Sequence, residues 1–349
     1  MYARQNFSGF PFRSGGVLVV LLALLIALSL TASPQDRAAM LQAGIEAYKS
    51  ARYDAAVEMF EKIARDTGAE KSLRREALEY LGRCYIAKRA TDKAREALRE
   101  LLELEPPLVE LDPDRESPPF LRLYYEVRKE KSGSPQVERP DPGIKTLAVI
   151  DFKNRSVDQK ERFDPMEKGF ADLLIHRLNG ATDLKVVERE RLQWILDEFN
   201  IQQKYSMEGA VRAGKLLGAH VVLLGSFIIV QDQMRLLARL VKVETGEILL
   251  TADVDGKAEK FFDLADKLSR QVARAIQAKL PEKSGEMGLG ETNSLEAMIT
   301  YSEGLALLEK GQYGEAYEKF LHALELDPGY ERARAKAESI KYLTNYAGG

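Results

Sequence analysis

The sequence is poor in several residue types on which crosslinking and metal binding depend. It has a single cysteine, Cys84, among 349 residues, so no disulfide can form within the chain. A chain without disulfides must be stable through packing alone, and we expect Cys84 to pack as a small apolar side chain in a helix pair. The three histidines, His176, His220 and His322, are scattered, whereas zinc sites draw three or four donors from short spacings or convergent elements. We therefore assign no metal site.

The chain also lacks a large excess of either charge. Its 51 Lys and Arg residues are balanced by 54 Asp and Glu residues, which gives a formal net charge of −3, and no basic block occurs. Proteins that bind nucleic acids or anionic membrane surfaces present clustered basic residues. The composition therefore argues against nucleic acid as a partner.

One long apolar run is present, at residues 17–32, and it follows Arg4 and Arg13 with no acidic residue between. This pattern is typical of an export signal, and we expect cleavage after Ala32. The alternative is an uncleaved anchor in the inner membrane, although the run is a little shorter than the ~20 residues that span a bilayer. We therefore predict an exported protein of the periplasm or the periplasmic face of the outer membrane. Membrane contact would come only through this segment or a partner.

The two flanks of the chain share a repeat of about 34 residues. Residues 44–60 and 304–320 carry Gly, Tyr, Ala and Phe at the same offsets, and residues 78–98 supply a further copy. Small residues let two antiparallel helices approach, and large apolar residues fill the space toward the next repeat. The spacing resembles the tetratricopeptide repeat, with these packing residues: Gly44, Ala56, Phe60, Leu81, Gly82, Tyr85, Ala94, Pro106, Gly304, Ala316, Phe320, Ala323 and Pro328.

Repeats of this kind need neighbours, because each one buries its apolar face only against the next. The N-terminal arm has two copies and a further helix at 117–130, where Ser117 and Pro118 fit the N-cap and first helical positions. The C-terminal arm has one copy followed by a helix at 331–343. We expect this lone repeat to dock on another domain or on a second chain. The repeats imply protein partners, including peptides held in their grooves.

Two polar segments containing Pro and Gly separate these arms from a central region. The predicted organisation is a signal peptide at 1–32, helical repeats at 33–131, a linker at 132–144, a central domain at 145–280, a second linker at 281–293 and the C-terminal repeat at 294–346.

The central region alternates helical and strand patterns. Asp164, Pro165 and Glu167 predict a capping box, followed by a helix with the apolar stripe Met166, Phe170, Leu174 and Leu178 that ends at Gly180. A strand at 184–189 leads into a second helix, and strands at 219–231, 234–243 and 247–256 are separated by short polar turns, which indicates an antiparallel meander. We expect an α+β domain, a layered α/β sandwich with a mixed sheet, flanked by all-α helical hairpins.

Four stretches in this region carry a resemblance to a known family. LAVIDFKNRS, VVERERLQWILDE, AGKLLGA and HVVLLGSF stand in the order found in the CsgG family, periplasmic and outer-membrane proteins named for the curli secretion channel. The resemblance implies a role in envelope assembly or secretion, without catalysis or a cofactor. Its residues here are Asp151, Phe152, Asn154, Glu188, Arg189, Glu198, Gly214, Gly218 and Gly225.

The chain departs from the channel subunits of that family, which are lipoproteins and insert long hairpins into the outer membrane. The export segment offers no cysteine for lipid attachment, and the hairpin at 234–256 places Arg235 and Arg239 on one face and Lys242 on the other. We therefore expect the hairpin to belong to the domain's own sheet. The favoured function is a non-enzymatic envelope scaffold that self-associates or docks to a complex; the alternative is a subunit of a CsgG-type secretion channel.

Three places in the central region are candidates for a functional site: Asp151, the pair Arg189 and Glu190, and Trp194. Asp151 follows a strand, but no histidine, lysine or acidic pair at a recognisable spacing supports catalysis. We therefore expect Asp151 and Asn154 each to form turn hydrogen bonds. Arg189 and Glu190 are expected on a solvated helix face, in preference to an intersubunit ion pair. Trp194 falls off its helix's apolar stripe and is expected to be exposed, as a partner contact.

The three glycines of the motif, Gly214, Gly218 and Gly225, precede a strand or lie within it. A dinucleotide loop instead connects a strand to the helix that follows, so we expect these glycines to allow close packing of helix on sheet. No catalytic, cofactor-binding or metal-binding residue is assigned.

Overall fold

The computed structural model describes residues 33–104, 111–136, 144–181, 183–280 and 291–346. The predicted export signal, Pro106 and parts of both predicted linkers lie outside the described residues. The chain divides into two compact units, residues 1–84 and 85–349, and each is described by itself. Among the described residues, every helix is too short or too polar to cross a membrane.

The first unit is built from paired helices. It contains α2 (Pro34–Lys49), α3 (Tyr53–Arg65) and most of α4 (Lys71–Ala87). A Cβ atom placed on Gly44 of α2 would overlap the ring of Phe60 on α3, so glycine sets the distance between the two helices. The Phe60 ring stacks on Tyr80 of α4 with centroids 5.2 Å apart, and Cys84 of α4 is buried.

The second unit begins with the end of the N-terminal helices. These are α5 (Thr91–Leu104) and α6 (Pro118–Ser132). Ser117 is the N-cap residue of α6 and Pro118 its first residue, as predicted, and Gly133 ends the helix with a positive φ of 70°. Arg95 of α5 contacts Glu126 and Glu130 of α6 at 2.8 and 2.6 Å, so ion pairs join the two helices.

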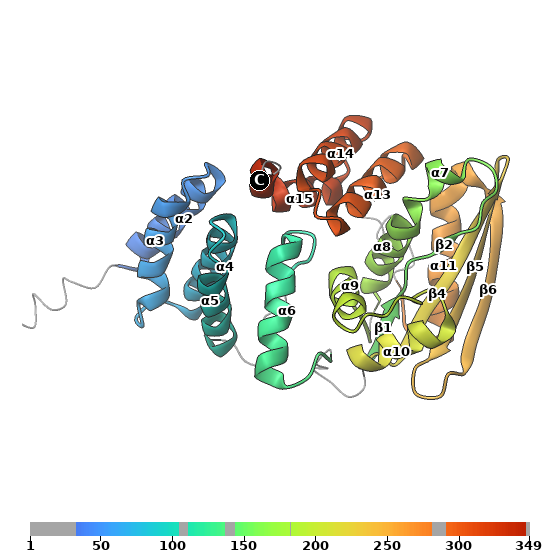
Figure 1. Ribbon diagram of the computed structural model, residues 1–349, viewed down its shortest axis with the longest axis horizontal. Coiled ribbons are helices and arrows are strands. Elements are labelled where there is room, and N and C mark those ends of the chain that lie inside the picture. The colour runs from blue at the N-terminus through green and yellow to red at the C-terminus, as the bar shows by residue number, and fades with distance from the viewer. Residues whose placement is uncertain (1–32, 105–110, 137–143, 182, 281–290, 347–349) are drawn as a thin grey trace, which may run out of the picture. The chain divides into compact units, whose positions relative to one another are not determined.

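The central sheet has six strands and is mixed (Figure 1). They are β1 (Lys145–Val149), β2 (Lys153–Asn154), β3 (Leu184–Val186), β4 (Val221–Val230), β5 (Gln233–Lys242) and β6 (Ile248–Lys257). The order is β3-β1-β4-β5-β6, and β2 pairs with β4. β1 runs parallel to β3 and β4, whereas β5 is antiparallel to β4 and β6. Both the mixed sheet and the antiparallel meander are therefore confirmed.

Helices pack on one face of the sheet and on part of the other, where the outward side of β5 and β6 is exposed. They are α7 (Lys160–Phe163), α8 (Met166–Asn179), α9 (Arg189–Glu198), α10 (Met207–Leu217), the 3-10 turn η1 (Ala258–Lys260) and α11 (Phe261–Ala275). Phe170 of α8 lies between the rings of Phe152 and Phe261, at centroid distances of 4.7 and 5.3 Å. α10 packs on the opposite face, where a Cβ on Gly214 would overlap Val222 of β4.

The start of α8 differs from the prediction. The apolar stripe of α8 is buried as expected, but Pro165 is the N-cap and no side chain caps the helix. Asp164 ends α7, and its carboxylate accepts hydrogen bonds from Asn154 Nδ2 at 2.9 Å and from Lys160 Nζ at 2.8 Å. The predicted capping box is wrong, because the Asp164 carboxylate binds Asn154 and Lys160 instead of the backbone N–H groups of α8.

The C-terminal repeat consists of α13 (Leu295–Glu309), α14 (Tyr313–Leu326), α15 (Glu331–Ile340) and the 3-10 helix η2 (Lys341–Tyr346). A Cβ on Gly304 would overlap Phe320, which repeats the Gly44 and Phe60 arrangement of the first unit. α13 packs against α8 of the central domain. The expectation that the lone repeat docks on another domain is confirmed.

The close packing around Gly225 leaves no room for a side chain, so a substitution there should destabilise the fold. A Cβ at this position on β4 would overlap the Phe152 ring and the Leu237 carbonyl oxygen. We expect Gly225→Ala to lower the free energy of unfolding by about 1–3 kcal/mol, measured by urea unfolding with the fluorescence of Trp194, the single tryptophan. Gly180→Ala is the control, because Gly180 has a φ of −76° and its Cβ would lie 3.8 Å from the nearest atom. Equal urea midpoints for the two variants would contradict the prediction.

Candidate functional site

Asp151 lies two residues beyond the carboxyl end of β1 and is the centre of a buried ion cluster. Its carboxylate is 2.6 Å from Lys204 Nζ, 3.5 Å from Lys168 Nζ and 3.7 Å from Arg189 Nε. Lys168 is in the first turn of α8, Arg189 is the first residue of α9, and Lys204 precedes α10. The three cations therefore converge on Asp151 from three different segments.

The cluster keeps Asp151 ionised. Burial alone raises the pKa of this carboxyl, but Arg189, Lys204 and Lys168 outweigh burial and lower the pKa to about 2. A carboxylate with so low a pKa holds no proton at neutral pH and is a weak proton acceptor. Its position at the carboxyl edge of parallel strands suits a ligand site, but here the cations of the chain itself surround it.

Glu309 brings the C-terminal repeat into the same cluster. This last residue of α13 forms ion pairs with Lys168 and Arg189. Burial raises the pKa of Glu309, but Arg189 and Lys168 lower it by a larger amount, so its pKa lies below the ordinary value. Burial likewise lowers the pKa of the Arg189 guanidinium, and Glu309 and Asp151 reverse that effect and raise it. Both carboxylates and Arg189 are therefore charged in the folded chain.

Arg332 of α15 forms a second buried cluster with three carboxylates. Its Nη2 is 2.6 Å from Asp172 of α8, its Nη1 is 2.9 Å from Glu291, and its Nε is 3.1 Å from Asp114. Burial lowers the pKa of Arg332, but Asp114 and Asp172 raise it well above its ordinary value. Tyr301 also donates its hydroxyl proton to Asp172 at 3.0 Å. The network joins the segment before α6, the central domain and the C-terminal repeat.

Lys336, one turn of α15 beyond Arg332, extends this network. Its Nζ contacts Glu190 of α9 at 2.5 Å and Asp114 at 3.4 Å, and it donates to the Pro113 carbonyl at 2.9 Å. A cavity of about 670 Å³ lies beside the network, with acidic side chains and Arg189 and Arg332 in its wall.

The helices α8 and α13 approach closely where these two clusters meet. A Cβ on Gly169 would overlap the Ser302 side chain, so only glycine permits this distance. Ser302 is fully buried and donates its hydroxyl proton to the Met298 carbonyl at 2.6 Å. Shape and charge together therefore fix the repeat on α8.

The structure corrects the expectation for Asp151. Instead of forming turn hydrogen bonds, this carboxylate is buried among cations. Asn154 does form the expected turn, because its Oδ1 accepts from the Ser156 N–H at 3.0 Å, and Phe152 is fully buried. Residue spacing could not reveal this cluster, because the lysines that contact Asp151 come from α8 and from the loop before α10.

Two expectations for α9 are also wrong. Arg189 and Glu190 do not lie on a solvated face, because Arg189 is 6% exposed and both residues form ion pairs with the C-terminal repeat of the same chain. Trp194 is 4% exposed and packs on Tyr125 of α6, with ring centroids 5.7 Å apart. Its burial by α6 removes the reason for assigning it a contact with a partner.

The remaining motif residues have structural surroundings. Glu188 accepts a hydrogen bond from Tyr125 at 3.3 Å, and the exposed Glu198 pairs with Lys129 of α6 at 2.8 Å. Gly218 ends α10 with a φ of 69°. His176, His220 and His322 come from α8, the start of β4 and α14; in the described part of the chain no three His, Cys, Asp or Glu side chains are grouped to hold a metal ion.

The repeat packing residues are mostly buried. Of the residues predicted, Ala56, Phe60, Ala94, Ala316, Phe320 and Ala323 are fully buried, whereas Pro328 is exposed in the turn between α14 and α15. The sequence argument did not find Lys168, Asp172, Lys204, Glu309, Arg332 or Lys336. Charged residues on amphipathic helices usually face solvent. Lys168 and Lys204 meet Asp151 within the central domain, and the docking of the repeat brings Glu309 to that cluster and Arg332 to Asp172.

The ion cluster makes a prediction about pH. Because the pKa of Asp151 in the folded chain lies below its ordinary 3.8, its carboxylate stabilises the fold above about pH 5, and this stabilisation is lost as pH falls toward 2. We expect Asp151→Asn to lower the free energy of unfolding by about 3–5 kcal/mol at pH 7, since it leaves buried cations uncompensated. The loss should shrink at about pH 3.

Urea unfolding across this pH range, followed by Trp194 fluorescence, measures both effects. Asp158→Asn, in an exposed loop, is the control and should change the unfolding free energy by less than about 0.5 kcal/mol. A loss in Asp151→Asn that is equally large at pH 3 and pH 7 would contradict the assignment.

Comparison with known proteins gives distant relatives. A curated protein of Rhizobium meliloti (strain 1021), "Putative adenylate cyclase 3", is 23% identical over 209 residues, which are 59% of this chain and 34% of that protein. The chain thus spans about a third of that relative's length. The LpoB C-terminal domain from Salmonella enterica is 16% identical with a TM-score of 0.29, covering 37% of this chain and 91% of that one. A lipoprotein from Neisseria meningitidis is 15% identical with a TM-score of 0.26, covering 38% and 98%.

Protein-family models match three parts of the chain. Residues 128–231 match the family described as curli production assembly/transport component CsgG. Residues 41–109 and 300–330 each match the tetratricopeptide repeat. These matches confirm the resemblance drawn from the sequence. The chain therefore carries a domain of the CsgG family between tetratricopeptide repeats.

Proposed function

We propose that this protein is a non-enzymatic, exported scaffold of the cell envelope. The single observation that carries the proposal is a CsgG domain fixed to a tetratricopeptide repeat by buried ion pairs and flanked by further repeats. Repeats of this kind form extended surfaces for binding proteins. The CsgG domain docks to an envelope complex or self-associates, and the repeats hold partner proteins or peptides.

The surroundings of Asp151 support a role without catalysis. A general base needs a pKa near the working pH and access to the substrate, whereas the pKa of Asp151 is held at about 2 and its carboxylate is surrounded by Lys168, Arg189 and Lys204. The arrangement serves instead to hold the ends of β1, α8 and α9 together with Glu309.

Partner binding is assigned to the N-terminal repeats. The first helix of the C-terminal repeat, α13, lies against α8, and its residues Met298, Tyr301 and Ser302 are buried. A peptide therefore has no access to that face of α13. The N-terminal repeats, matched at residues 41–109, are therefore the candidates for binding other proteins.

Deletion of residues 34–84 tests this assignment. We expect an affinity-tagged chain without these residues to lose most of the proteins that the full chain recovers from cross-linked envelope extracts, quantified by mass spectrometry. The midpoint of urea unfolding, followed by Trp194 fluorescence, should stay unchanged. This measurement checks that the central domain is folded.

A point variant gives a milder form of the same test. Gly44→Val places side-chain atoms in the Phe60 ring and should reduce recovery, while Gly68→Ala, whose Cβ would lie 3.2 Å from the flexible end of Arg37, should not. Unchanged recovery after the deletion would refute the assignment of partner binding to the N-terminal repeats. Purification as a detergent-requiring oligomer that conducts ions would refute the scaffold and favour a secretion channel.

A further inference from the structure

Strand β6 forms one edge of the central sheet, since β5 is its only strand neighbour among the described residues (Figure 1). An edge strand presents backbone N–H and C=O groups without partners, and proteins commonly protect such edges with a short strand or a proline. β6 contains no proline and runs for ten residues, whereas strands are usually about 5–6 residues long. The strand therefore offers a long row of backbone groups with which another strand can pair.

The register of β5 and β6 shows which residues face the open edge. The Ala258 N–H donates to the Asp232 carbonyl at 2.7 Å, in register with the pairs of the two strands. Hydrogen-bonded and non-hydrogen-bonded pairs alternate along an antiparallel ladder, so the even-numbered residues of β6 bond to β5. The N–H and C=O groups of three odd-numbered residues point to the open edge: Thr251, Asp253 and Asp255.

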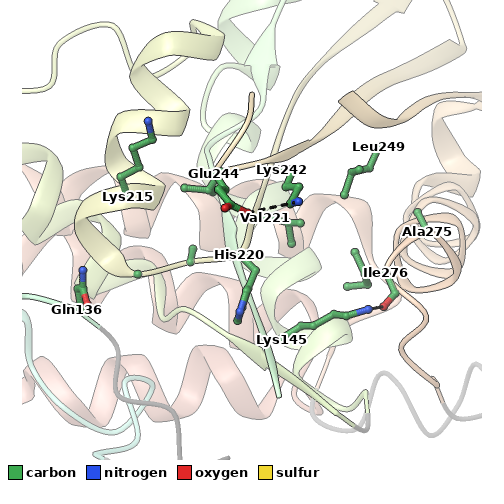
Figure 2. A pocket seen from close by; sticks show the side chains of 13 residues that line it. Gln136, Lys145, Lys215, His220, Val221, Lys242, Glu244, Leu249, Ala275 and Ile276 are labelled. Atoms are coloured by element: carbon green, nitrogen blue, oxygen red, sulfur yellow. Dashed lines mark hydrogen bonds and ion pairs between the residues drawn. The ribbon is translucent and has the colours of Figure 1, made fainter. Parts of the chain in front are cut away.

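Polar side chains near the start of β6 differ from this row, because they already have partners. In the pocket of about 490 Å³ that lies there, Lys145 Nζ donates to the Ile276 carbonyl at 2.6 Å (Figure 2). Lys242 Nζ lies 3.4 Å from the Glu244 carboxylate in the same pocket. The edge-facing backbone groups of β6, in contrast, have no partner among the described residues.

The side chains of the three edge-facing residues make this edge acidic. Thr251, Asp253 and Asp255 are all exposed on the outward side of β6. Arg235 of β5 lies opposite Asp255 in the register but forms its ion pair with Asp253. One arginine thus serves two carboxylates, and a basic side chain on an added strand would supply the second positive charge.

The same charges argue against a second copy of β6 at this edge. A two-fold axis places the two copies of a strand antiparallel. With the axis at the centre of the row, Asp253 would lie opposite its own copy. Like charges directly opposite each other destabilise a strand pair. A strand with basic side chains fits the edge better than β6 itself.

We propose that β6 binds an extended segment of a partner protein that carries basic residues at alternate positions. The segment adds to the sheet as an antiparallel strand, and its backbone pairs with Thr251, Asp253 and Asp255. Its basic side chains lie opposite the two aspartates. In strand addition the main-chain hydrogen bonds provide affinity and the alternate side chains provide selectivity. The proposal rests on the proposed scaffold function, because it names the surface through which the central domain docks.

A synthetic peptide, Thr-Thr-Thr-Lys-Thr-Lys-Thr-Thr-Thr, tests the charge requirement. Threonine favours extended structure, and the two lysines are spaced to meet Asp255 and Asp253. We expect the labelled peptide to bind the full chain saturably in fluorescence anisotropy, at least about tenfold more tightly than the same peptide with glutamate in place of lysine. Equal affinities for the two peptides, or no saturable binding, would overturn the proposal.

N-methylation of the peptide tests whether its backbone pairs with β6. In the bound peptide the lysine N–H groups face β6, and the N–H groups of the threonines that follow them face away. Methylation of the two lysine amides should weaken binding at least about tenfold, whereas methylation of those two threonine amides should change it less than about threefold. Equal effects of the two methylations would show that backbone pairing is not involved and would overturn the proposal.

A charge-reversal variant locates the peptide on β6. Asp255→Lys should weaken peptide binding at least about tenfold, because a lysine of the peptide then meets a lysine of the chain. Asp158→Lys makes the same change of charge in an exposed loop and is the matched control. Unchanged urea midpoints confirm folding. Equal peptide affinity in the two variants would place the peptide elsewhere and overturn the proposal.

Amide hydrogen exchange of the full chain distinguishes the peptide from a second copy. The peptide should slow exchange at Thr251, Asp253 and Asp255 and leave the residues between them, which already bond to β5, unchanged. Protection of these three amides without peptide, growing with protein concentration, would assign the edge to a second copy and overturn the proposal. These outcomes do not depend on the N-terminal repeats, so a failure here is distinguishable from a failure of the deletion experiment.

Discussion

Arg332 holds three distant parts of the chain together, because its guanidinium group lies within hydrogen-bond distance of Asp114, Asp172 and Glu291. A guanidinium group presents five N–H donors in a planar arrangement, so it can serve several carboxylates at once. The position of the C-terminal repeat on the central domain depends on this contact and on the Glu309 ion pairs with Lys168 and Arg189.

The energetics of such contacts explain their role. Removing charges from water is costly, so a buried ion pair contributes little net stability, yet the loss of one partner costs several kcal/mol. The network therefore specifies where the repeat sits more than how stable the chain is. The Gly169 and Ser302 crossing supplies the matching shape, since any side chain at Gly169 would push α13 away and separate the charges.

We infer from this arrangement that the two arms have different tasks. In the C-terminal repeat, one face of α13 packs against α8. The hydroxyl oxygen of Ser117, the N-cap residue of α6, lies 2.5 Å from the hydroxyl oxygen of Tyr342 in η2. The repeat thus acts as part of the central domain. We propose that the N-terminal repeats, in contrast, bind partner proteins.

Local patterns predicted the elements of the fold well. The stripe on α8, the meander of β4, β5 and β6, and the Gly304 and Phe320 pair follow from spacing within a few residues, so the sequence alone indicates them. The surroundings of Asp151, Arg189 and Trp194 do not, because Lys204, Glu309 and α6 reach them only through tertiary packing. The 160 residues that separate Asp172 from Arg332 carry no spacing signal. Arg189 and Glu190, which the sequence predicted on a solvated helix face, form ion pairs between the central domain and the C-terminal repeat.

Native-state hydrogen exchange at neutral pH, resolved by mass spectrometry, tests most directly whether the network makes one cooperative unit. We expect the amides of α13, α14 and α15 to share the protection of α8 and to exchange together with it. Exchange of α13 to α15 through a separate, lower-energy opening while α8 stays protected would contradict it.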